Sequence, residues 1–421
     1  YAPAPAVEGE KDRYVITGYK NSYEYMDEFK MLFPRMHSPQ AHHVDAYKSW
    51  ADVKGKRVRY DYCGQTKTEY CPTFGENLKF FFRYQVNFMY WRYFMWNFAG
   101  RQNDIQSHGE LTKGNWISGI PFIDNTMLGD QSKLPTELRE NKGHNVYYFL
   151  PLILGLIGLF WQLGKHTNEG KNKEGYRSFA IVFLLFFLTG LAIVVYLNQT
   201  PYQPRERDYA YAGSFYAFCI WIGLGVMAII DLLNRVVKND KVRTVAAVVT
   251  VLVTLLVPAQ MASQNWDDHD RSNRYSARDF GANYLKSCDK EAIIFCNGDN
   301  DTFPLWYNIE VEEERNDVRA CNLSYLQTDW YIDQMKRPYY NSPGLPISWE
   351  YKDYMPGKNE IAWVENRLHA PLEVSKAFQF LLSDDPRTKR DGEGYIPSDQ
   401  LYVLSPDSQK IMFKKARRFT R

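Results

Sequence analysis

The sequence predicts an α-helical membrane region, with four transmembrane helices, followed by an extracytoplasmic α/β domain. Three observations predict this fold class. Four apolar runs lie close together between residues 147 and 261, although the mean hydropathy of the chain is only -0.46. Lys and Arg gather in two of the links between these runs, and short apolar strands alternate with helices after the last one. The 421 residues suffice for two or three domains, and the net charge of +2 gives no case for binding nucleic acid.

The four apolar runs are Tyr147–Leu163, Phe179–Leu197, Ala212–Leu233 and Thr244–Met261. Each is close to the roughly 20 residues that an α-helix needs to cross a bilayer core. We therefore expect residues 147–261 to form a four-helix transmembrane region. A transporter is disfavoured because no run shows the central charge or the Gly/Pro break that marks a substrate path.

The links between the runs set the expected orientation. Gly164–Arg177 and Asn234–Arg243 each carry four Lys or Arg residues. An excess of Lys and Arg marks the cytoplasmic side of a membrane protein. The loop 198–211 and the large regions 1–146 and 262–421 are then expected on the outer side, which is periplasmic or lumenal.

The aromatic segment 79–100 reads KFFFRYQVNFMYWRYFMWNFAG. It contains Arg83 and Arg92, and an unpaired Arg in the middle of a bilayer is costly. Its many Trp and Tyr residues are typical of the membrane interface. We expect an interfacial segment within the outer region 1–146. The alternative is a fifth crossing, which would place residues 1–78 in the cytoplasm.

The sequence of the last region, 262–421, predicts an α/β domain with one βαβ unit. We expect that a further domain once followed it. Its expected elements are a helix at Arg278–Ser287, a strand at Ala292–Cys296, a helix at Phe303–Glu314 and a strand at Asp317–Leu323. Sites in such sheets gather at the carboxyl ends of the strands. Asp299 and Asp301 follow the first strand and are therefore expected there.

Four charged residues stand in the loop between the second and third runs: Arg205, Glu206, Arg207 and Asp208. The planar guanidinium group of Arg suits phosphate because it forms bidentate, charge-assisted hydrogen bonds. A lipid-linked phosphate would present its headgroup at this depth. Glu206 and Asp208 would hold the guanidinium groups or contact a polar substrate. The alternative is a self-neutralised, salt-bridged turn.

Two further pairs of polar residues are candidate contacts for an acceptor or a sugar. Asp299 and Asp301 form an Asp-x-Asp sequence, which allows a divalent metal site or a contact with a sugar hydroxyl. The alternative is a turn with a helix N-cap, where Asn and Asp are preferred. Arg101 and Asp104 follow the aromatic segment, and their alternative is a polar loop that ends a helix. No catalytic residue and no metal ligand is assigned.

Several unusual blocks resemble a known family. They include GENLKFFFRYQVNFMYWRYFMWNFAGRQND, GNWISGIPFIDN, LNQTPYQPRERDYAYAGSFYAFCIWIGLG and FCNGDNDTFPLWY. They are similar to a bacterial family of large multispanning membrane proteins of formerly unknown function. That family is grouped with the GT-C glycosyltransferases and with the eukaryotic transmembrane protein O-mannosyltransferase. The resemblance covers residues from about 75 to 335.

The resemblance implies the C-terminal part of a glycosyltransferase of the bacterial inner membrane. It would move a sugar from a polyprenyl-phosphate donor to a protein or glycan acceptor on the outer face, with membrane lipid and the lipid-linked sugar as partners. The main catalytic acid of such enzymes lies in the first outer loop, which is expected ahead of Tyr1. The resemblance strengthens the assignment of Arg205 and Arg207 to the donor phosphate. The alternative function is a non-catalytic membrane subunit that anchors a periplasmic assembly.

Overall fold

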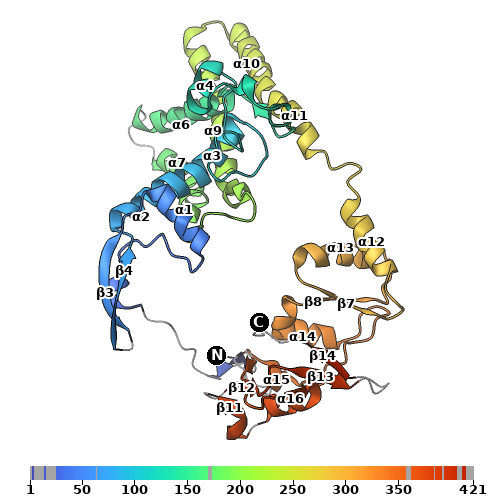
Figure 1. The fold of residues 1–421 in the computed structure, drawn as a ribbon. Coiled ribbons are helices and arrows are strands. Elements are labelled where there is room, and N and C mark those ends of the chain that lie inside the picture. The colour runs from blue at the N-terminus through green and yellow to red at the C-terminus, as the bar shows by residue number, and fades with distance from the viewer. Residues whose placement is uncertain are drawn as a thin grey trace. The chain divides into compact units, whose positions relative to one another are not determined.

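The computed structural model describes residues 25–62, 64–168, 173–356, 362–383, 385–390 and 393–404, and the backbone of short strands at 2–3, 14–15 and 410–413. The chain forms two units (Figure 1). The helical unit is Tyr23–Asp270, and the α/β unit combines Tyr1–Ser22 with Arg271–Arg421. The predicted regions 1–146 and 147–261 therefore share one unit for most of their length.

The helical unit begins with helix α1 (Ala41–Ala51) and an antiparallel hairpin of β3 (Lys56–Tyr62) and β4 (Gln65–Cys71). Thr73 and Glu76 then form a capping box that starts the next helix. Glu76 also accepts hydrogen bonds from the amides of Lys54 and Gly55, at 2.7 and 3.1 Å. Burial raises the pKa of Glu76, but the hydrogen bonds from Thr73, Lys54 and Gly55 lower it to about 2. Glu76 therefore ties the hairpin to the helix as a carboxylate.

The aromatic segment lies in one continuous helical rod made of α2 (Phe74–Phe80), the π-helix η2 (Phe81–Trp91) and α3 (Arg92–Phe98). In the π-helical part the amide of Arg92 bonds to the carbonyl of Asn87, five residues back. Most large side chains of the rod belong to the hydrophobic core of the helical unit, including Phe80, Tyr84, Phe88, Tyr90, Tyr93, Phe94, Trp96 and Phe98. The segment is thus packed inside the unit, and its position at a membrane interface stays a prediction.

Three helices among the described residues are long and apolar enough to cross a membrane. They are Tyr176–Leu197, Asp208–Val236 and Asp240–His269. Their parts are α7 (Lys173–Leu188) with α8 (Leu191–Leu197), η4 (Asp208–Tyr211) with α9 (Ala212–Val236), and α10 (Asp240–Thr254) with α11 (Leu256–His269).

The predicted count of four such helices is corrected to three. The first apolar run forms α6 (Leu150–Asn168), which is apolar only over Leu150–Gly164 and is shorter than a span. The cause is local, because Tyr148 and Phe149 have φ values of 53° and 59°. These left-handed residues form a turn, so the helix begins after it instead of at Tyr147.

The first long span is interrupted at Thr189–Gly190, between α7 and α8. A Cβ atom on Gly190 would lie 2.6 Å from Ser214 Oγ and 2.7 Å from the Tyr90 hydroxyl. The Gly190 amide bonds to Phe187 instead of Phe186, and the Ser214 hydroxyl donates to the carbonyl of Phe186 at 2.8 Å. The expectation of spans without such a break was therefore wrong here. Gly190 leaves room for a polar contact between helices.

Helices α6 and α9 pack with their backbones close together. A Cβ on Gly158 would lie 1.9 Å from the carbonyl oxygen of Trp221, and one on Gly225 would lie 2.1 Å from that of Leu154. A Cβ on Gly155 would lie 2.3 Å from the Phe218 ring. Small residues at such contacts are typical of helix association in membranes.

Arg35 joins the N-terminal part of the helical unit to the end of the first span. Its side chain is buried, with 6% of its surface exposed. Its guanidinium donates to the carbonyl of Val195 at 3.0 Å and of Val194 at 3.2 Å, at the C-terminal end of α8. Its Nε donates to Gln85 on the aromatic rod at 3.0 Å. A cation at this position also complements the negative end of the helix dipole.

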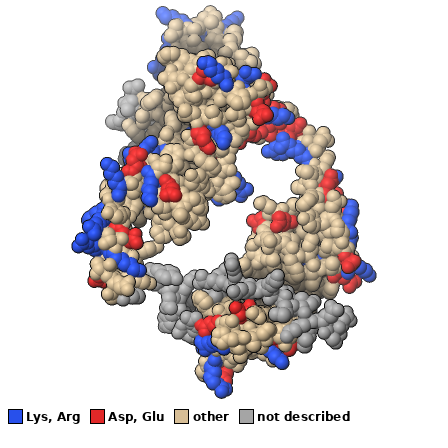
Figure 2. Space-filling view, in the orientation of Figure 1, with Lys and Arg blue, Asp and Glu red and all other residues tan. Residues whose placement is uncertain are grey.

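The exposed surface of the last span is apolar. Val245, Val248, Leu252 and Leu255 are among its large side chains that are more than half exposed. Lys and Arg gather where α10 begins, at the top of the view in Figure 2. An apolar helical surface with basic residues at one end suits contact with lipid and the positive-inside rule.

The α/β unit contains the predicted βαβ arrangement. Helix α12 (Ser276–Lys286) precedes strand β7 (Ile293–Cys296), helix α13 (Asp299–Glu310) and strand β8 (Arg319–Asn322). The strands are parallel, with Ile293 opposite Arg319 and Cys296 opposite Asn322. The βαβ prediction is confirmed, although α13 begins four residues before the predicted Phe303.

The remaining elements are shorter. In the helical unit they are η1 (Asp27–Phe29), β5 (Gly100–Arg101), α4 (Pro121–Leu128), η3 (Gln131–Lys133), α5 (Thr136–Arg139) and β6 (Asn145–Val146). In the α/β unit the helices are η5 (Tyr325–Gln327), α14 (Asp329–Lys336), α15 (Tyr351–Tyr354), α16 (Val374–Leu382) and η6 (Pro386–Thr388). Its other strands are β1 (Ala2–Pro3), β2 (Tyr14–Val15), β9 (Trp363–Val364), β10 (Leu372–Glu373), β11 (Lys389–Arg390), β12 (Glu393–Ile396), β13 (Leu401–Leu404) and β14 (Lys410–Phe413).

Candidate functional site

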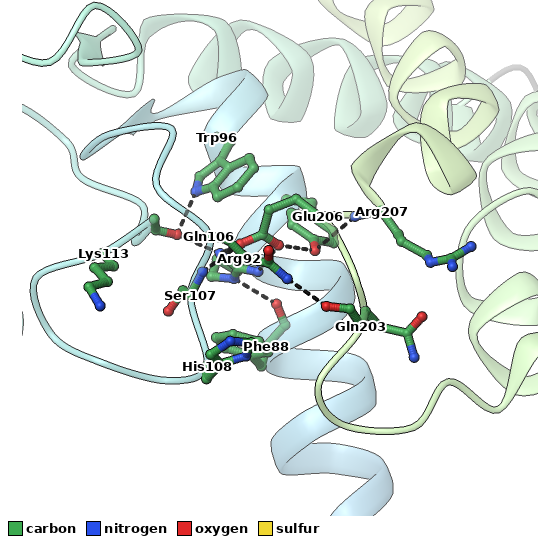
Figure 3. Close-up of polar contacts among 12 residues, drawn as sticks. Phe88, Arg92, Trp96, Gln106, Ser107, His108, Lys113, Gln203, Glu206 and Arg207 are labelled. Atoms are coloured by element: carbon green, nitrogen blue, oxygen red, sulfur yellow. Dashed lines mark hydrogen bonds and ion pairs between the residues drawn. The ribbon is translucent and has the colours of Figure 1, made fainter. Parts of the chain in front are cut away.

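Glu206, in the charged loop, pairs with an arginine from the aromatic rod. Its carboxylate accepts from Arg92 Nη2 at 2.8 Å and Nη1 at 3.3 Å, from the Tyr93 hydroxyl, and from the amide of Ser107 at 2.9 Å (Figure 3). The prediction that Glu206 holds the guanidinium groups of its neighbours Arg205 and Arg207 is therefore wrong. The alternative of a self-neutralised turn does not describe Glu206 either, because its cation comes from another element.

Arg92 is a buried cation, with 4% of its surface exposed, and each of its three side-chain nitrogens donates a hydrogen bond. Its Nε donates to the carbonyl of Phe88 at 3.0 Å, and its Nη1 donates to that of Gly114 at 2.6 Å. The centre of its guanidinium lies 4.0 Å from the ring centroid of Phe88 and 4.8 Å from that of Trp96. The signal in the sequence for this ion pair was Arg92 itself, because an arginine within an apolar segment requires an anionic partner.

Tyr93 connects this pair to the loop backbone. Its hydroxyl donates to Glu206 and accepts from the amide of Arg207 at 3.2 Å. Burial raises the pKa of the Tyr93 phenol, with the charge of Arg92 opposing the shift and that of Glu206 adding to it. Tyr93 therefore remains a protonated donor, and the loop is fixed through both a side chain and a main-chain amide.

Arg205 and Arg207 have no carboxylate within ion-pair distance among the residues that the structure describes. Arg205 is exposed, with its guanidinium 5.8 Å from the ring centroid of Tyr209. The Nε of Arg207 is buried without a hydrogen-bond partner in the described part of the chain. Figure 3 shows the Arg207 side chain directed away from the Arg92–Glu206 pair. Both guanidinium groups therefore stay open to an anion.

A small cavity of about 20 Å³ adjoins Glu206, Arg205 and His108. This volume is enough for a single water molecule, since one probe sphere needs roughly 10–15 Å³. It leaves no room for a substrate beside Glu206. We therefore assign Glu206 to holding the loop in place.

A larger cavity of about 390 Å³ lies nearby in the helical unit. Three aromatic side chains, Trp96, Tyr147 and Trp266, line it together with polar ones from α3, β5, β6, η4 and α11. The polar residues are Asn97, Arg101, Asn145, Asp208, Asn265 and His269. Because Asp208 begins the second span and His269 ends the third, the cavity lies at the end of the spans that is opposite the basic link 234–243.

The cavity brings together Arg101 and Asp208, which the sequence placed in different roles. Arg101 Nη2 pairs with Asp268 at 2.7 Å, and its Nε donates to the carbonyl of Gly143 at 2.8 Å. In the described ranges Asp208 has no cation within ion-pair distance. Asp104 does not line the cavity, and its amide donates to Asn141 Oδ1 at 3.2 Å.

The other lining residues were not found by sequence reasoning. Asn265 Nδ2 donates to the Tyr147 hydroxyl at 2.5 Å, and Asn145 Nδ2 donates to Asn265 Oδ1 at 3.0 Å. These residues come from separate parts of the chain and belong to no motif. Only Trp96 gave a signal, through the density of aromatic residues in segment 79–100.

Asp299 and Asp301 lie in the α/β unit, in the first turn of α13 after β7, as the βαβ prediction requires. Asp299 Oδ1 accepts from the Tyr325 hydroxyl at 2.7 Å. Asp301 lines a separate cavity of about 170 Å³ with Cys296 and Tyr284. The helix N-cap is Gly298, not an Asn or Asp side chain. Within the described residues, no group of three or more His, Cys, Asp or Glu is placed to hold a metal ion.

Comparison with known proteins supports a distant relationship to O-mannosyl-transferases. Residues 277–416 match the family TMEM260-associated domain 2, and residues 2–82 match a family of unknown function (DUF8416). The protein O-mannosyl-transferase tmem260 of Dictyostelium discoideum is 23% identical over 233 residues, which are 49% of this chain. The match spans 27% of the length of that relative. No solved structure matches the chain.

Proposed function

We propose that this chain is part of a multi-pass membrane glycosyltransferase that moves a sugar from a polyprenyl-phosphate donor to a protein or glycan acceptor on the outer face. The observation that carries the proposal is the cavity of about 390 Å³ that combines Arg101, Asp208 and three aromatic rings. The distant relationship to an O-mannosyl-transferase supports the sugar as the transferred group.

The cavity has the chemistry that a sugar requires. Flat aromatic faces pack against the apolar face of a sugar ring, while amides and a carboxylate bond to its hydroxyl groups. Asp208 accepts the proton of the acceptor hydroxyl in this scheme, as a general base whose carboxylate lies within about 3 Å of the hydroxyl oxygen. Arg101, held by Asp268, positions the sugar or the acceptor.

The donor phosphate binds Arg205 and Arg207 in this scheme. The two residues lie one and three positions before Asp208 in the chain. Their guanidinium groups have no carboxylate partner within the described part of the structure. Charge-assisted hydrogen bonds from such groups suit a phosphate. Glu206 acts indirectly, because its bonds to Arg92 and Tyr93 fix the loop. Asp104, Asp299 and Asp301 lie outside this cavity and take no step in the scheme.

Transfer of mannose from a synthetic polyprenyl-phosphate mannose by the full-length protein tests the proposal. We expect Asp208→Asn to lower the rate at least about 100-fold, in line with the loss of a general base. We expect the double variant Arg205→Ala/Arg207→Ala to raise the KM for the donor. Asp104→Asn is the matched control and should retain the activity of the wild type.

Full activity in both Asp208→Asn and the double arginine variant would overturn the proposal. A protein that shows no transfer, holds no polyprenyl phosphate when its lipids are analysed by mass spectrometry and copurifies with a stoichiometric partner would instead be an anchoring subunit.

A further inference from the structure

Arg319, on strand β8 of the α/β unit, is a buried cation with an incomplete set of partners. It is 4% exposed, and its Nε and Nη1 have no hydrogen-bond partner among the described residues. Its Nη2 donates to the carbonyls of Gln334 at 3.0 Å and Arg337 at 2.7 Å, at the end of α14. The centre of its guanidinium also lies 5.5 Å from the ring centroid of Tyr339. A buried guanidinium without an anion is costly, so a missing anionic partner is expected.

Arg319 is one of the residues that line a cavity of about 200 Å³. An engineered cavity of roughly 150 Å³ in another protein holds a benzene molecule, so this space suits one six-membered ring with a substituent. Trp306, Tyr339 and Met335 supply apolar and aromatic surface, and Asn316 and Gln334 supply polar groups. The ligand is therefore small, partly flat and partly polar.

Glu310 gives the same cavity an anchored acceptor. Its carboxylate accepts hydrogen bonds from the hydroxyls of Tyr339 and Tyr340, each at 2.9 Å. The remaining lone pairs of a carboxylate held in this way can accept from ligand hydroxyl groups. A buried cation beside a fixed carboxylate selects a ligand that carries both a negative group and hydroxyl donors.

We propose that this cavity binds an acidic monosaccharide, with a carboxylate or a phosphate on Arg319, the ring against Trp306 and hydroxyl groups on Glu310. The site is independent of the glycosyl-transfer proposal, because all its residues lie in the α/β unit and none lines the cavity at Asp208. It assigns a binding site to the region that matches TMEM260-associated domain 2.

Isothermal titration of the full chain in mild detergent tests the site. The probes are glucuronate and glucose 6-phosphate, which distinguish a carboxylate from a phosphate, with glucose and inorganic phosphate as controls. We expect saturable binding of one acidic sugar, at least about tenfold tighter than inorganic phosphate, because additional hydrogen bonds to charged groups contribute on this scale. Glucose should give no saturable heat.

Two variants separate ligand binding from a structural role of Arg319. Asn316→Asp keeps the oxygen that accepts from Asn341 Nδ2 at 2.9 Å but adds a negative charge at the cavity. It should weaken binding of the acidic sugar at least about tenfold through like-charge repulsion. Glu310→Gln removes a negative charge and should tighten binding of inorganic phosphate. Asn283→Asp is the matched control. It makes the same change from Asn to Asp at an exposed position of α12 outside the cavity, and it should leave binding of the acidic sugar unchanged.

Three results would overturn the site. The first is no saturable heat with either acidic sugar. The second is equal affinity for inorganic phosphate and the acidic sugars. The third is an equal loss of affinity in Asn316→Asp and Asn283→Asp, which would show a general charge effect.

Discussion

Among individual residues, Glu206 shows how a charged loop is held against a helix. Its partner Arg92 lies 114 positions earlier in the chain, at the start of α3 in the aromatic rod. The pair is nearly enclosed, since the side chains of Arg92 and Glu206 are 4% and 18% exposed. Removal of one partner from a buried ion pair leaves the other charge without compensation. This carboxylate therefore contributes to the position of the loop, together with the bond from the Arg207 amide to Tyr93.

Glu206→Ala should destabilise the helical unit by about 3 kcal/mol, at the lower end of the range for a broken buried pair because Glu206 is partly exposed. Arg205→Ala is the neighbouring control and should change stability by less than about 0.5 kcal/mol, as exposed substitutions do. Thermal unfolding of both variants in detergent micelles measures the difference. Equal melting temperatures for the two variants would contradict the structural role of the pair.

Sequence reasoning found part of this site and missed the rest for a physical reason. Arg101 and Asp208 were both selected as polar groups near the membrane, and the structure places them on one cavity. Glu206 was assigned to Arg205 and Arg207 because they are its neighbours in the chain. An ion pair forms between charges that are close in space, and Arg92 lies close to Glu206 only when the rod packs against the loop.

Among the elements, α6 and α9 pack with their backbones close together. Three glycines permit an approach that side chains would prevent, and the tightest is Gly158 against the backbone of Trp221. Periodic apolar residues predicted both helices. They did not predict the left-handed turn at Tyr148 and Phe149. They also did not predict the break at Gly190, because it depends on contacts with Tyr90 and Ser214 from other elements.

Gly158→Ala should destabilise the unit by about 2 kcal/mol or more, because the added methyl group overpacks a backbone contact. Gly223→Ala is the matched control on α9, since a Cβ there would meet no atom within 4 Å. It should be neutral or stabilising by about 0.5 kcal/mol, because Ala favours the helix. Melting temperatures in detergent compare the two. Similar losses of melting temperature in the two variants would show that helix propensity, not packing, causes the destabilisation.

For the whole molecule, the membrane orientation connects the basic links to the cavity. The loop 198–211 and the end of the third span lie at one end of the spans, and the link 234–243 lies at the other. The positive-inside rule predicts that the cavity lies on the outer side. The βαβ unit shows what sequence alone could predict in the α/β unit, because its strand and helix periods are local properties.

Labelling with a membrane-impermeant maleimide tests this orientation in a cysteine-free background. In intact right-side-out vesicles, Tyr202→Cys in the outer loop should react, because Tyr202 is 47% exposed. Lys238→Cys in the basic link should react only after detergent is added. The opposite pattern would place the cavity at Asp208 on the cytoplasmic side and contradict the proposed site of transfer.

The hydrogen bonds of Arg35 bear on where this chain can be cut. The match to the family of unknown function ends at residue 82, inside the rod that runs from Phe74 to Phe98. Arg35 lies within that match, yet it bonds to the carbonyls of Val194 and Val195 at the end of a membrane span. Excision of the matched segment would cut a helix and remove the donor to the carbonyls of Val194 and Val195. The part of the matched segment around Arg35 and the end of the first span therefore belong to one packed unit.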